Sequence, residues 1–577
     1  MNGIVFNAGA SAFTITAPPL LTLTLSGVGI TNSSGTMQNF VTTINGSGGE
    51  GAIVFNNTAT AGSMTTFTNT GSAFSGVFGG FTQFNNTSTA GSGAFINNGG
   101  TVSGAFGGFT AFNSSATAGS GTFTNNGAGV ASSTSGGSTG FFNTSTAGNG
   151  TFTNNGGTTV SGAFGGTTGF NNGSTAGSGT FTSNPGTVSG AFGGITDFLD
   201  TSTAGSGTFT NNGTGVSGAG GGFTRFFGTS TAGSGTFTNN GGTVSSTTGR
   251  GNTVFFGTST ADNGNFTNNA GTVVGALGGR TQFSESSTAG NATLIANGGL
   301  GSGGTIQFFG SSTGGTARME VFNNGAGTAG NLDISFHDAP GVTTGSIEGS
   351  GAVFLGAFNL TVGNNNLTTT FSGVIQDGGL NGGTGGSLTK MGNGKLTLSM
   401  ASTYTGGTTI TKGTLLVTNQ TGSGTGTGAV QVNKGTLGGT GKITGAVTVG
   451  TGTSSGAILL PGKSATNPGT LTINGALTFN SLSTYKCVLK RSVVKASKAT
   501  ALGVTINSSS SFTFVDNGSG TLTVGTVFTV INNTSANTIF CTFSNLADGS
   551  VFTSNGNNFQ ASYTGGNGND LTLTVVP

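Results

Sequence analysis

Acidic and basic residues that could cleave a polysaccharide are few in this sequence, and they are scattered. Asp197 and Asp200 lie one copy of an internal repeat before Arg225, and further charged residues follow at Arg250, Asp262 and Arg280. Glycoside cleavage needs two carboxyl groups held close together with their pKa values shifted apart. These acids stand singly, at positions where the residue type varies between repeats. We therefore expect no catalytic residue among them.

Other motifs for catalysis or ion binding give no stronger signal. His337 is the only histidine, and a lone histidine is more often a turn residue than a base or a ligand. The glycine-rich stretches lack the pattern of calcium-binding nonapeptides, and no helix follows the GTGTG at 424–428, as a phosphate loop requires. We expect no cofactor and no metal ion.

The two cysteines, Cys487 and Cys541, are too few for a disulfide framework, and their spacing fits no metal motif. We expect two free thiols. A disulfide is the alternative if the strands that hold them lie side by side.

The elements that would position any site are predicted to be strands. Of 577 residues only 5% are charged, whereas 118 are Gly and 46 are Phe. Gly, Ser, Thr and Asn favour turns and strands over helices, and so many phenylalanines need a core that removes them from water. The chain is therefore predicted to be all-β. No stretch of 18 apolar residues predicts a membrane helix.

Positive charge gathers near the C-terminus, although the net charge is only +2. Such a run could bind a polyanion, but a solvated strand and loop is the simpler interpretation, and we expect no nucleic-acid partner. The run consists of Lys486, Lys490, Arg491, Lys495 and Lys498.

One phrase, S-T-A-G or a close variant, recurs every 28 or 29 residues and sets the period of the fold. Propeller blades usually need about 40 residues or more, whereas about 28 residues suit one coil of a three-sided parallel β-helix, with three short strands and three corners. The alanine of the phrase, or its equivalent, stands at Ala61, Ala90, Ala118, Ala147, Ala176, Ala204, Ala232, Ala261, Ala289 and, after a shorter gap, Gly314.

Two columns of phenylalanine recur in register with this phrase. The residue just before each Phe of the first column varies from Gln to Asp to Arg, which indicates that the Phe faces inward and its neighbour faces water. Each buried ring contributes about 1.5–3 kcal/mol. The first predicted ladder is Phe55, Phe84, Phe112, Phe141, Phe170, Phe198, Phe226, Phe255, Phe283 and Phe308; the second is Phe95, Phe123, Phe152, Phe181, Phe209, Phe237 and Phe266.

Two further columns accompany the phenylalanines. Paired asparagines, at 125–126, 154–155, 211–212 and 239–240, are expected to form hydrogen-bonded ladders at the corners. A third, less strict apolar column runs through Val102, Val130, Val160, Val188, Val216 and Val244.

Threonines flank the inward Phe on five successive coils. A flat double row of threonine resembles the faces of ice-binding proteins, whereas the simpler interpretation is that Thr suits an outward strand position. The candidate array is Thr122, Thr124, Thr151, Thr153, Thr180, Thr182, Thr208, Thr210, Thr236 and Thr238.

The pattern divides the chain into four parts. Residues 1–50 are predicted to form an N-terminal β segment or cap, 51–340 the regular solenoid with 28–29-residue coils, 341–480 a second β-helix segment with a different repeat at 386–419, and 481–577 a β-rich cap or small sandwich. An open solenoid end would expose a strand edge, so caps are expected. The first residues lack the cationic start of a secretory signal, and we expect that the signal has been removed from this form of the chain.

The stretch GKLTLSMASTYTGGTTITKGTL, at 394–415, resembles the passenger-associated transport repeat of bacterial autotransporters. The resemblance implies a secreted or surface-exposed right-handed β-helix, in which the repeat is associated with secretion and folding and has no catalytic residue. We expect no C-terminal translocator barrel after Pro577. The matching positions are Leu396, Leu398, Tyr404, Gly406, Gly407, Thr408, Gly413 and Leu415.

We therefore expect an extracellular or bacterial outer-surface solenoid that is a rigid, non-catalytic stalk or an adhesive surface. Its low charge and its Asn- and Thr-rich exterior would suit glycans or neighbouring cell-surface proteins. With its caps in place the chain is expected to be a monomer, and end-to-end or lateral self-association is the alternative. An ice-binding solenoid and a polysaccharide-active β-helix are the alternatives.

Overall fold

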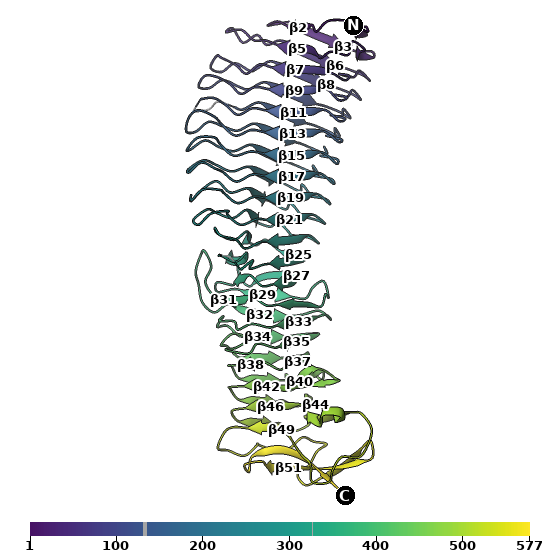
Figure 1. The fold of residues 1–577 in the computed structure, drawn as a ribbon, viewed down its shortest axis with the longest axis vertical. Coiled ribbons are helices and arrows are strands. Elements are labelled where there is room, and N and C mark those ends of the chain that lie inside the picture. Colours follow the sequence, from purple (N-terminus) through teal and green to yellow (C-terminus); the bar gives the residue numbers. More distant parts are fainter. Residues whose placement is uncertain (131–134, 326) are drawn as a thin grey trace. The chain divides into compact units, whose positions relative to one another are not determined.

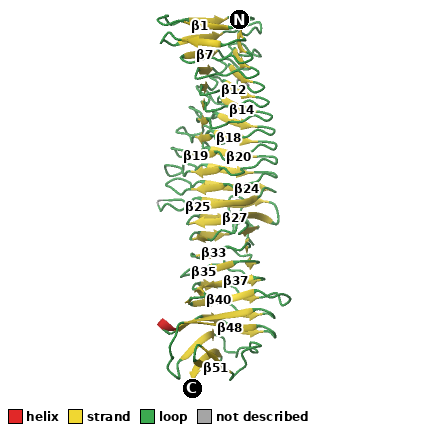
Figure 2. Ribbon diagram, turned by 90° about the vertical axis from the view of Figure 1, so that its right-hand side faces the viewer, coloured by secondary structure: helices red, strands yellow, loops and turns green. Residues whose placement is uncertain are grey.

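The computed structural model describes residues 1–130, 135–325 and 327–577. They form two compact units, Met1–Thr313 with Phe322–Asn331, and Gly314–Val321 with Leu332–Pro577. Within the described residues the only helix is a single 3₁₀ turn, η1 (Arg491–Val493) (Figure 2). The all-β parallel β-solenoid predicted from the repeat is confirmed.

In the first unit, coil after coil adds one strand to each of two parallel sheets, with β5 to β21 one above another in Figure 1. A short pair, β1 (Gly3–Phe6) and β4 (Gly29–Asn32), lies at the N-terminus. The first sheet contains β3 (Thr22–Leu25), β6 (Ala52–Phe55), β8 (Phe81–Phe84), β10 (Phe109–Phe112), β12 (Ser138–Phe141), β14 (Thr167–Phe170), β16 (Ile195–Phe198), β18 (Phe223–Phe226), β20 (Asn252–Phe255), β22 (Arg280–Phe283) and β24 (Thr305–Gly310). The second contains β2 (Thr14–Ala17), β5 (Gln38–Thr42), β7 (Thr65–Asn69), β9 (Ala94–Asn97), β11 (Thr122–Asn125), β13 (Thr151–Asn154), β15 (Thr180–Ser183), β17 (Thr208–Asn211), β19 (Thr236–Asn239), β21 (Asn265–Asn268) and β23 (Thr293–Ala296).

The third side of each coil is smaller than predicted. Instead of a strand it holds one threonine that bridges to the threonine of the next coil, as Thr89 does to Thr117. The Thr89 hydroxyl accepts the backbone N–H of Gly91 at 3.1 Å, and Gly91 has a φ of 60°. This local hydrogen bond turns the chain at once, which is why the pairing ends after a single residue.

The two phenylalanine columns fill the interior of the first unit. All ten residues of the first column and all seven of the second are at most 1% exposed. Rings stack within a column, as Phe141 on Phe170 at 4.7 Å, and the columns meet edge to face, as Phe170 with Phe181 at 5.6 Å. Phe67 and Phe40 extend the second column towards the N-terminus. These two phenylalanines were not predicted from the sequence, because the repeat is irregular in that part of the chain.

A polar ladder runs through the same interior. Asn97 donates to Asn125 at 2.8 Å, and Asn125 donates to Asn154 at 2.8 Å. On most coils an inward threonine of the first sheet also donates to the asparagine oxygen, as Thr139 does to Asn125 at 3.0 Å, but on β15 Ser183 takes the place of the asparagine. The second asparagine of each pair forms an outer ladder, such as Asn155 to Asn126 at 3.0 Å. The predicted asparagine ladders are thus confirmed, and the inner one is fully buried.

The valines of the third column do not belong to this core. Val102, Val130, Val188, Val216 and Val244 are half-buried, and Val160 is exposed, because they lie in the loop between the two sheets. Small residues occupy the interior there instead, such as Ala163, Ala191 and Ala219, none of them more than 1% exposed. The narrow corner leaves no room for a larger side chain.

The second unit continues the parallel pairing and ends in a mixed sheet. Its coils are shorter, and their core is mostly aliphatic except near the C-terminus, where buried aromatic rings such as Phe479, Tyr485 and Phe543 pack together. Its strands are β25 (Gly314–Val321), β26 (Asn331–His337), β27 (Gly341–Gly349), β28 (Ala352–Phe354), β29 (Asn359–Val362), β30 (Thr369–Phe371), β31 (Val374–Gln376), β32 (Ser387–Lys390), β33 (Lys395–Leu398), β34 (Thr408–Ile410), β35 (Thr414–Val417), β36 (Val430–Val432), β37 (Gly435–Gly439), β38 (Lys442–Ile443), β39 (Val447–Val449), β40 (Ala457–Ser464), β41 (Asn467–Pro468), β42 (Thr470–Ile473), β43 (Leu477–Phe479), β44 (Thr484–Lys490), β45 (Lys495–Ala496), β46 (Lys498–Ala501), β47 (Val504–Ile506), β48 (Ser511–Asn517), β49 (Val527–Asn533), β50 (Val551–Ser554), β51 (Asn557–Gly565) and β52 (Asp570–Val576).

Candidate functional site

The outward threonines form an aligned array on the second sheet of the first unit. Parallel pairing places Thr151 on Thr180 and Thr153 on Thr182, and the same register continues over the five coils. The outer row is exposed: Thr122, Thr151, Thr180, Thr208 and Thr236. The inner row is half-buried: Thr124, Thr153, Thr182, Thr210 and Thr238. The array is uncharged and lies on regular strands, so its hydroxyl groups are held in a fixed pattern.

The acids considered for polysaccharide cleavage have separate partners. Asp197 lies opposite Arg225 on the neighbouring strand, and its carboxylate accepts two hydrogen bonds from that guanidinium, at 2.8 and 2.7 Å. Asp200 lies in a turn with a φ of 55°, where it accepts the backbone N–H of Asn172 at 3.0 Å. Each carboxylate therefore has a structural contact of its own.

Arg250 and Arg280 lie close together and lack a carboxylate partner within 4 Å among the described residues. Burial, and then the nearby Arg250 charge, lower the pKa of Arg280 to about 10. Its Nε donates to Asn252 at 3.1 Å. Asp262 contacts Thr231 and Asn263 instead, so the structure does not join it to these cations.

A pair of carboxylates that the sequence analysis missed lies in the second unit. Glu320 on β25 is directly opposite Glu348 on β27, and Arg318 forms ion pairs with both. Burial is the main cause that raises the pKa of Glu320. The 28-residue spacing of the two glutamates, which equals one repeat, could have predicted that they lie opposite each other. The S-T-A-G repeat is no longer regular in that part of the sequence, so the spacing was not recognised.

The remaining single residues have structural contacts. His337 ends β26, is 7% exposed, and its Nδ1 lies 2.6 Å from the carbonyl of Asp338. Cys487 is buried, Cys541 is exposed, and both are free thiols, as expected. No group of three or more potential metal ligands occurs in the described ranges.

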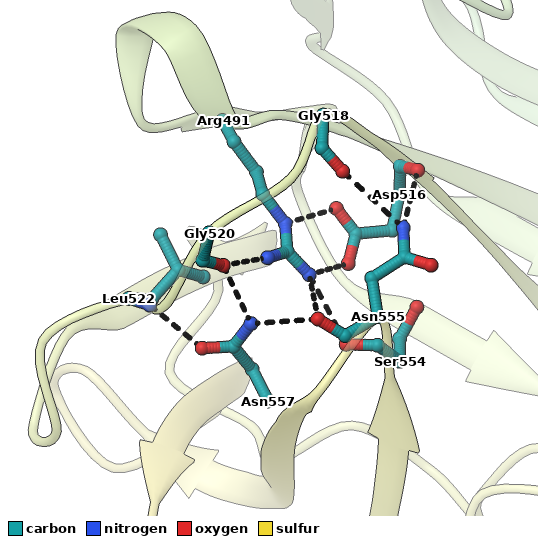
Figure 3. A network of polar contacts seen from close by, with 8 residues as sticks. All are labelled: Arg491, Asp516, Gly518, Gly520, Leu522, Ser554, Asn555 and Asn557. Carbon is teal, nitrogen blue, oxygen red and sulfur yellow. Dashed lines mark hydrogen bonds and ion pairs between the residues drawn. The ribbon is translucent and has the colours of Figure 1, made fainter.

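The basic run near the C-terminus is not one surface patch, because Arg491 is buried. Its guanidinium forms two hydrogen bonds with the carboxylate of Asp516, one of them at 2.7 Å, and donates to the carbonyls of Gly520, Ser554 and Asn555 (Figure 3). Among its neighbours in sequence, Lys495 is exposed, and Lys486, Lys490 and Lys498 are half-buried. Arg491 therefore joins β48, which pairs with β44, to the end of β50 in the seven-stranded terminal sheet and to the loop at Gly520, instead of facing a polyanion.

The motif at 394–415 supplies a compact core. Leu396, Leu398 and Leu415 are buried, and the fully buried Tyr404 lies 2.5 Å, oxygen to oxygen, from the hydroxyl of Thr408. A Cβ on Gly406, Gly407 or Gly413 would lie 2.2–2.6 Å from a backbone carbonyl of a neighbouring coil. These motif residues thus serve the close stacking of the coils.

Just before this motif, Lys390 is 1% exposed. Its ammonium donates to the carbonyls of Met391, Gly392 and Lys412, and burial lowers its pKa to about 8. Lys390 thereby joins the turns of two successive coils.

These contacts define a parallel β-solenoid whose polar residues mostly serve stacking. Residues 388–417 match the family model "Passenger-associated-transport-repeat", so the chain carries this repeat. No curated protein matches the sequence. Among solved structures, the crystal structure of the Haemophilus influenzae Hap adhesin is similar at 12% identity and a TM-score of 0.26, over 99% of this chain and 58% of that one. The chain thus spans less than two thirds of that structure. No helix in the described part of the chain is long and apolar enough to cross a membrane.

Proposed function

We propose that this chain is a secreted or cell-surface solenoid with a structural or adhesive role, and that it is not an enzyme. The aligned, uncharged threonine array carries the proposal, because it offers many equivalent hydroxyl groups on a rigid sheet. Such a surface suits glycans or neighbouring cell-surface proteins that bind through many weak contacts. The passenger-associated repeat supports export to the cell surface.

A glycan array probed with the purified chain tests this proposal. We expect binding that is lost when Thr180→Lys and Thr208→Lys place charge on the array. The matched control is Thr167→Lys with Ile195→Lys, at outward positions of the first sheet. Binding to no glycan and to no cell surface, or equal loss in the control, would contradict an adhesive threonine face.

Ice binding is a second candidate because the threonine rows are in register over five coils. We expect no inhibition of ice recrystallisation, since the array ends at Ala94 and Ile96 on one side and at Asn265 on the other. Activity that disappears in Thr180→Val with Thr208→Val would replace the adhesive proposal.

Polysaccharide cleavage is the third candidate, and only the Glu320–Glu348 pair favours it. We expect no turnover of pectin, alginate or other common polysaccharides, because Arg318 already binds both carboxylates. Turnover that is lost in Glu320→Gln and in Glu348→Gln, but kept in Asp197→Asn, would show that the chain is an enzyme.

A further inference from the structure

An aromatic groove of about 430 Å³ lies on the first unit and has no part in the threonine array. Its walls are two rows of outward phenylalanines, Phe78 with Phe106 and Phe81 with Phe109. Its floor consists of Gly79, Gly107 and Gly136. The glycines are needed there, because a Cβ on Gly79 or Gly107 would lie 2.5 or 2.2 Å from the carbonyl oxygen of the next coil.

The strand register explains why the groove has two ends. At the C-terminal end, the positions of both phenylalanines are taken by Ser135 and Ser138. At the N-terminal end Ala52 takes the position of Phe81, and Glu50 lines the groove. Small residues therefore bound the aromatic walls on both sides, and a carboxylate borders one end.

One face of Phe78 is left uncovered by the stack. Phe78 stacks on Phe106 with ring centroids 4.6 Å apart and planes 22° apart, so both rings face along the stacking direction. The other face of Phe78 is turned towards the preceding coil, in which Ala52 takes the position of Phe81 and Glu50 lines the groove. Phe78 is 61% exposed.

Glu50 is the only charged side chain in the first 196 residues of the sequence. It has no cationic partner within 4 Å in the described ranges. The negative faces of aromatic rings and an unpaired carboxylate attract the same kind of ligand, a cation. An apolar groove also favours a cation that gives up its water readily, such as an alkylated ammonium, over a strongly hydrated metal ion.

We propose that this groove binds an organic cation, with a quaternary ammonium group near Glu50 and Phe78 and its apolar part along the phenylalanine rows. The inference is independent of the adhesive function, which rests on the other sheet.

Choline and its neutral isostere 3,3-dimethylbutan-1-ol test the proposal on the full chain. Both carry three equivalent methyl groups, whose NMR signals report binding directly. We expect choline to bind at least about fivefold more tightly than the neutral alcohol, because only the cation gains from the rings and the carboxylate. Added salt should weaken choline binding and leave the alcohol unaffected.

Four single variants locate the site. Glu50→Gln and Phe78→Leu keep the size of the groove and should each lower choline affinity about threefold or more, without changing the affinity for the alcohol. The controls are Glu285→Gln, a carboxylate in a distant turn, and Phe192→Leu, an exposed ring that stacks on Phe164. Neither control should change choline affinity.

Three results would overturn the proposal. Equal binding of choline and the alcohol would indicate an apolar groove without charge selectivity. Absence of choline binding up to its highest usable concentration would exclude the site. Loss of binding in the controls, or none in Glu50→Gln and Phe78→Leu, would place the cation elsewhere.

Discussion

At the scale of single residues, Phe170 illustrates what holds the first unit together. Its ring stacks on Phe141 at 4.7 Å and on Phe198 at 4.8 Å, and it meets the edge of Phe181 at 5.6 Å. Its neighbours are themselves fixed by stacking and by the backbone ladder, so they have little freedom to fill a gap. The repetition that builds the core also makes it unable to relax around a cavity.

We therefore expect Phe170→Ala to lower the free energy of unfolding by about 3–5 kcal/mol, the range for a phenylalanine removed from a rigid core. Denaturant unfolding of the first unit would measure it. The matched control is Phe192→Ala, whose ring is 49% exposed, and which should cost less than about 1 kcal/mol. An unchanged midpoint for Phe170→Ala would contradict the importance of the ladder.

Lys390 makes the stability of the second unit depend on pH. Its pKa is about 8 in the folded chain against 10.5 ordinarily, because burial penalises the charged ammonium. Between these values the unfolded chain binds a proton that the folded chain has lost, so stability rises with pH. Above pH 10 the effect would be opposed by tyrosine ionisation, since burial raises the pKa of Tyr404 and Tyr485 above the usual value.

We expect the unfolding free energy of the unchanged chain, taken relative to that of Lys390→Met, to increase by about 2 kcal/mol between about pH 7 and about pH 9.5. The comparison cancels the opposite contribution of Cys487, because burial raises the pKa of its thiol in both chains. Chemical denaturation at several pH values, with Lys395→Met as a half-buried control on the next strand, would measure both. The same dependence on pH in the unchanged chain and in Lys390→Met would show that Lys390 is not the group responsible.

At the scale of elements, the sequence predicted the columns well and the corners poorly. The phenylalanine columns were visible because one residue type recurs at a fixed position of the repeat while its neighbour varies. The prediction of a third core column from the valines was wrong, because apolar character alone does not distinguish a residue of a core strand from one in a half-exposed loop. The prediction of a strand on the third side was wrong, because the hydrogen bond that ends the pairing there, from the Gly91 N–H to the Thr89 hydroxyl, leaves no signal in hydrophobic periodicity. For the candidate site, the threonine array could be predicted from the repeat, whereas the Glu320–Glu348 pair could not.

Near the C-terminus, one buried ion pair joins elements of two sheets. Arg491 and Asp516 have side chains only 4% and 2% exposed, and the pair joins η1 and β48 to the ends of β50 and the loop at Gly520 (Figure 3). The Asp516 hydrogen bond, more than the ionic attraction, raises the pKa of Arg491. Removing the carboxylate would leave a buried cation without its counter-charge.

We expect Asp516→Asn to destabilise the second unit by about 3 kcal/mol or more, as for other broken buried ion pairs. The double variant Asp516→Asn with Arg491→Met should recover part of this loss, because it removes the uncompensated charge. Asp197→Asn breaks a more exposed pair, in which the Arg225 side chain is 34% exposed, and should cost about 0–1 kcal/mol. Equal costs for Asp516→Asn and Asp197→Asn would contradict the structural role of the buried pair.

At the scale of the whole molecule, a stack of coils is open to association wherever its last strand has no neighbouring strand to pair with. An unpaired parallel strand presents free N–H and C=O groups to a second chain. In the second unit the stack gives way to antiparallel pairs, β49 with β52, β52 with β51 and β51 with β50. This change of direction gives the last strands a hairpin-like closure that another coil cannot simply extend.

Removing residues after 480 would uncover three strands at once. β40 would lose β44, β42 would lose β46, and β43 would lose β47. We expect the full chain to be a monomer and the shortened chain to associate end to end, with a mass that grows with concentration in size-exclusion chromatography with light scattering. Placing lysines at Thr470 and Thr478, which are half-buried outward positions of the uncovered strands, should restore the monomer because charge on an edge opposes pairing. If the shortened chain stays monomeric at high concentration, or the full chain already forms fibres, the terminal sheet does not act as a cap.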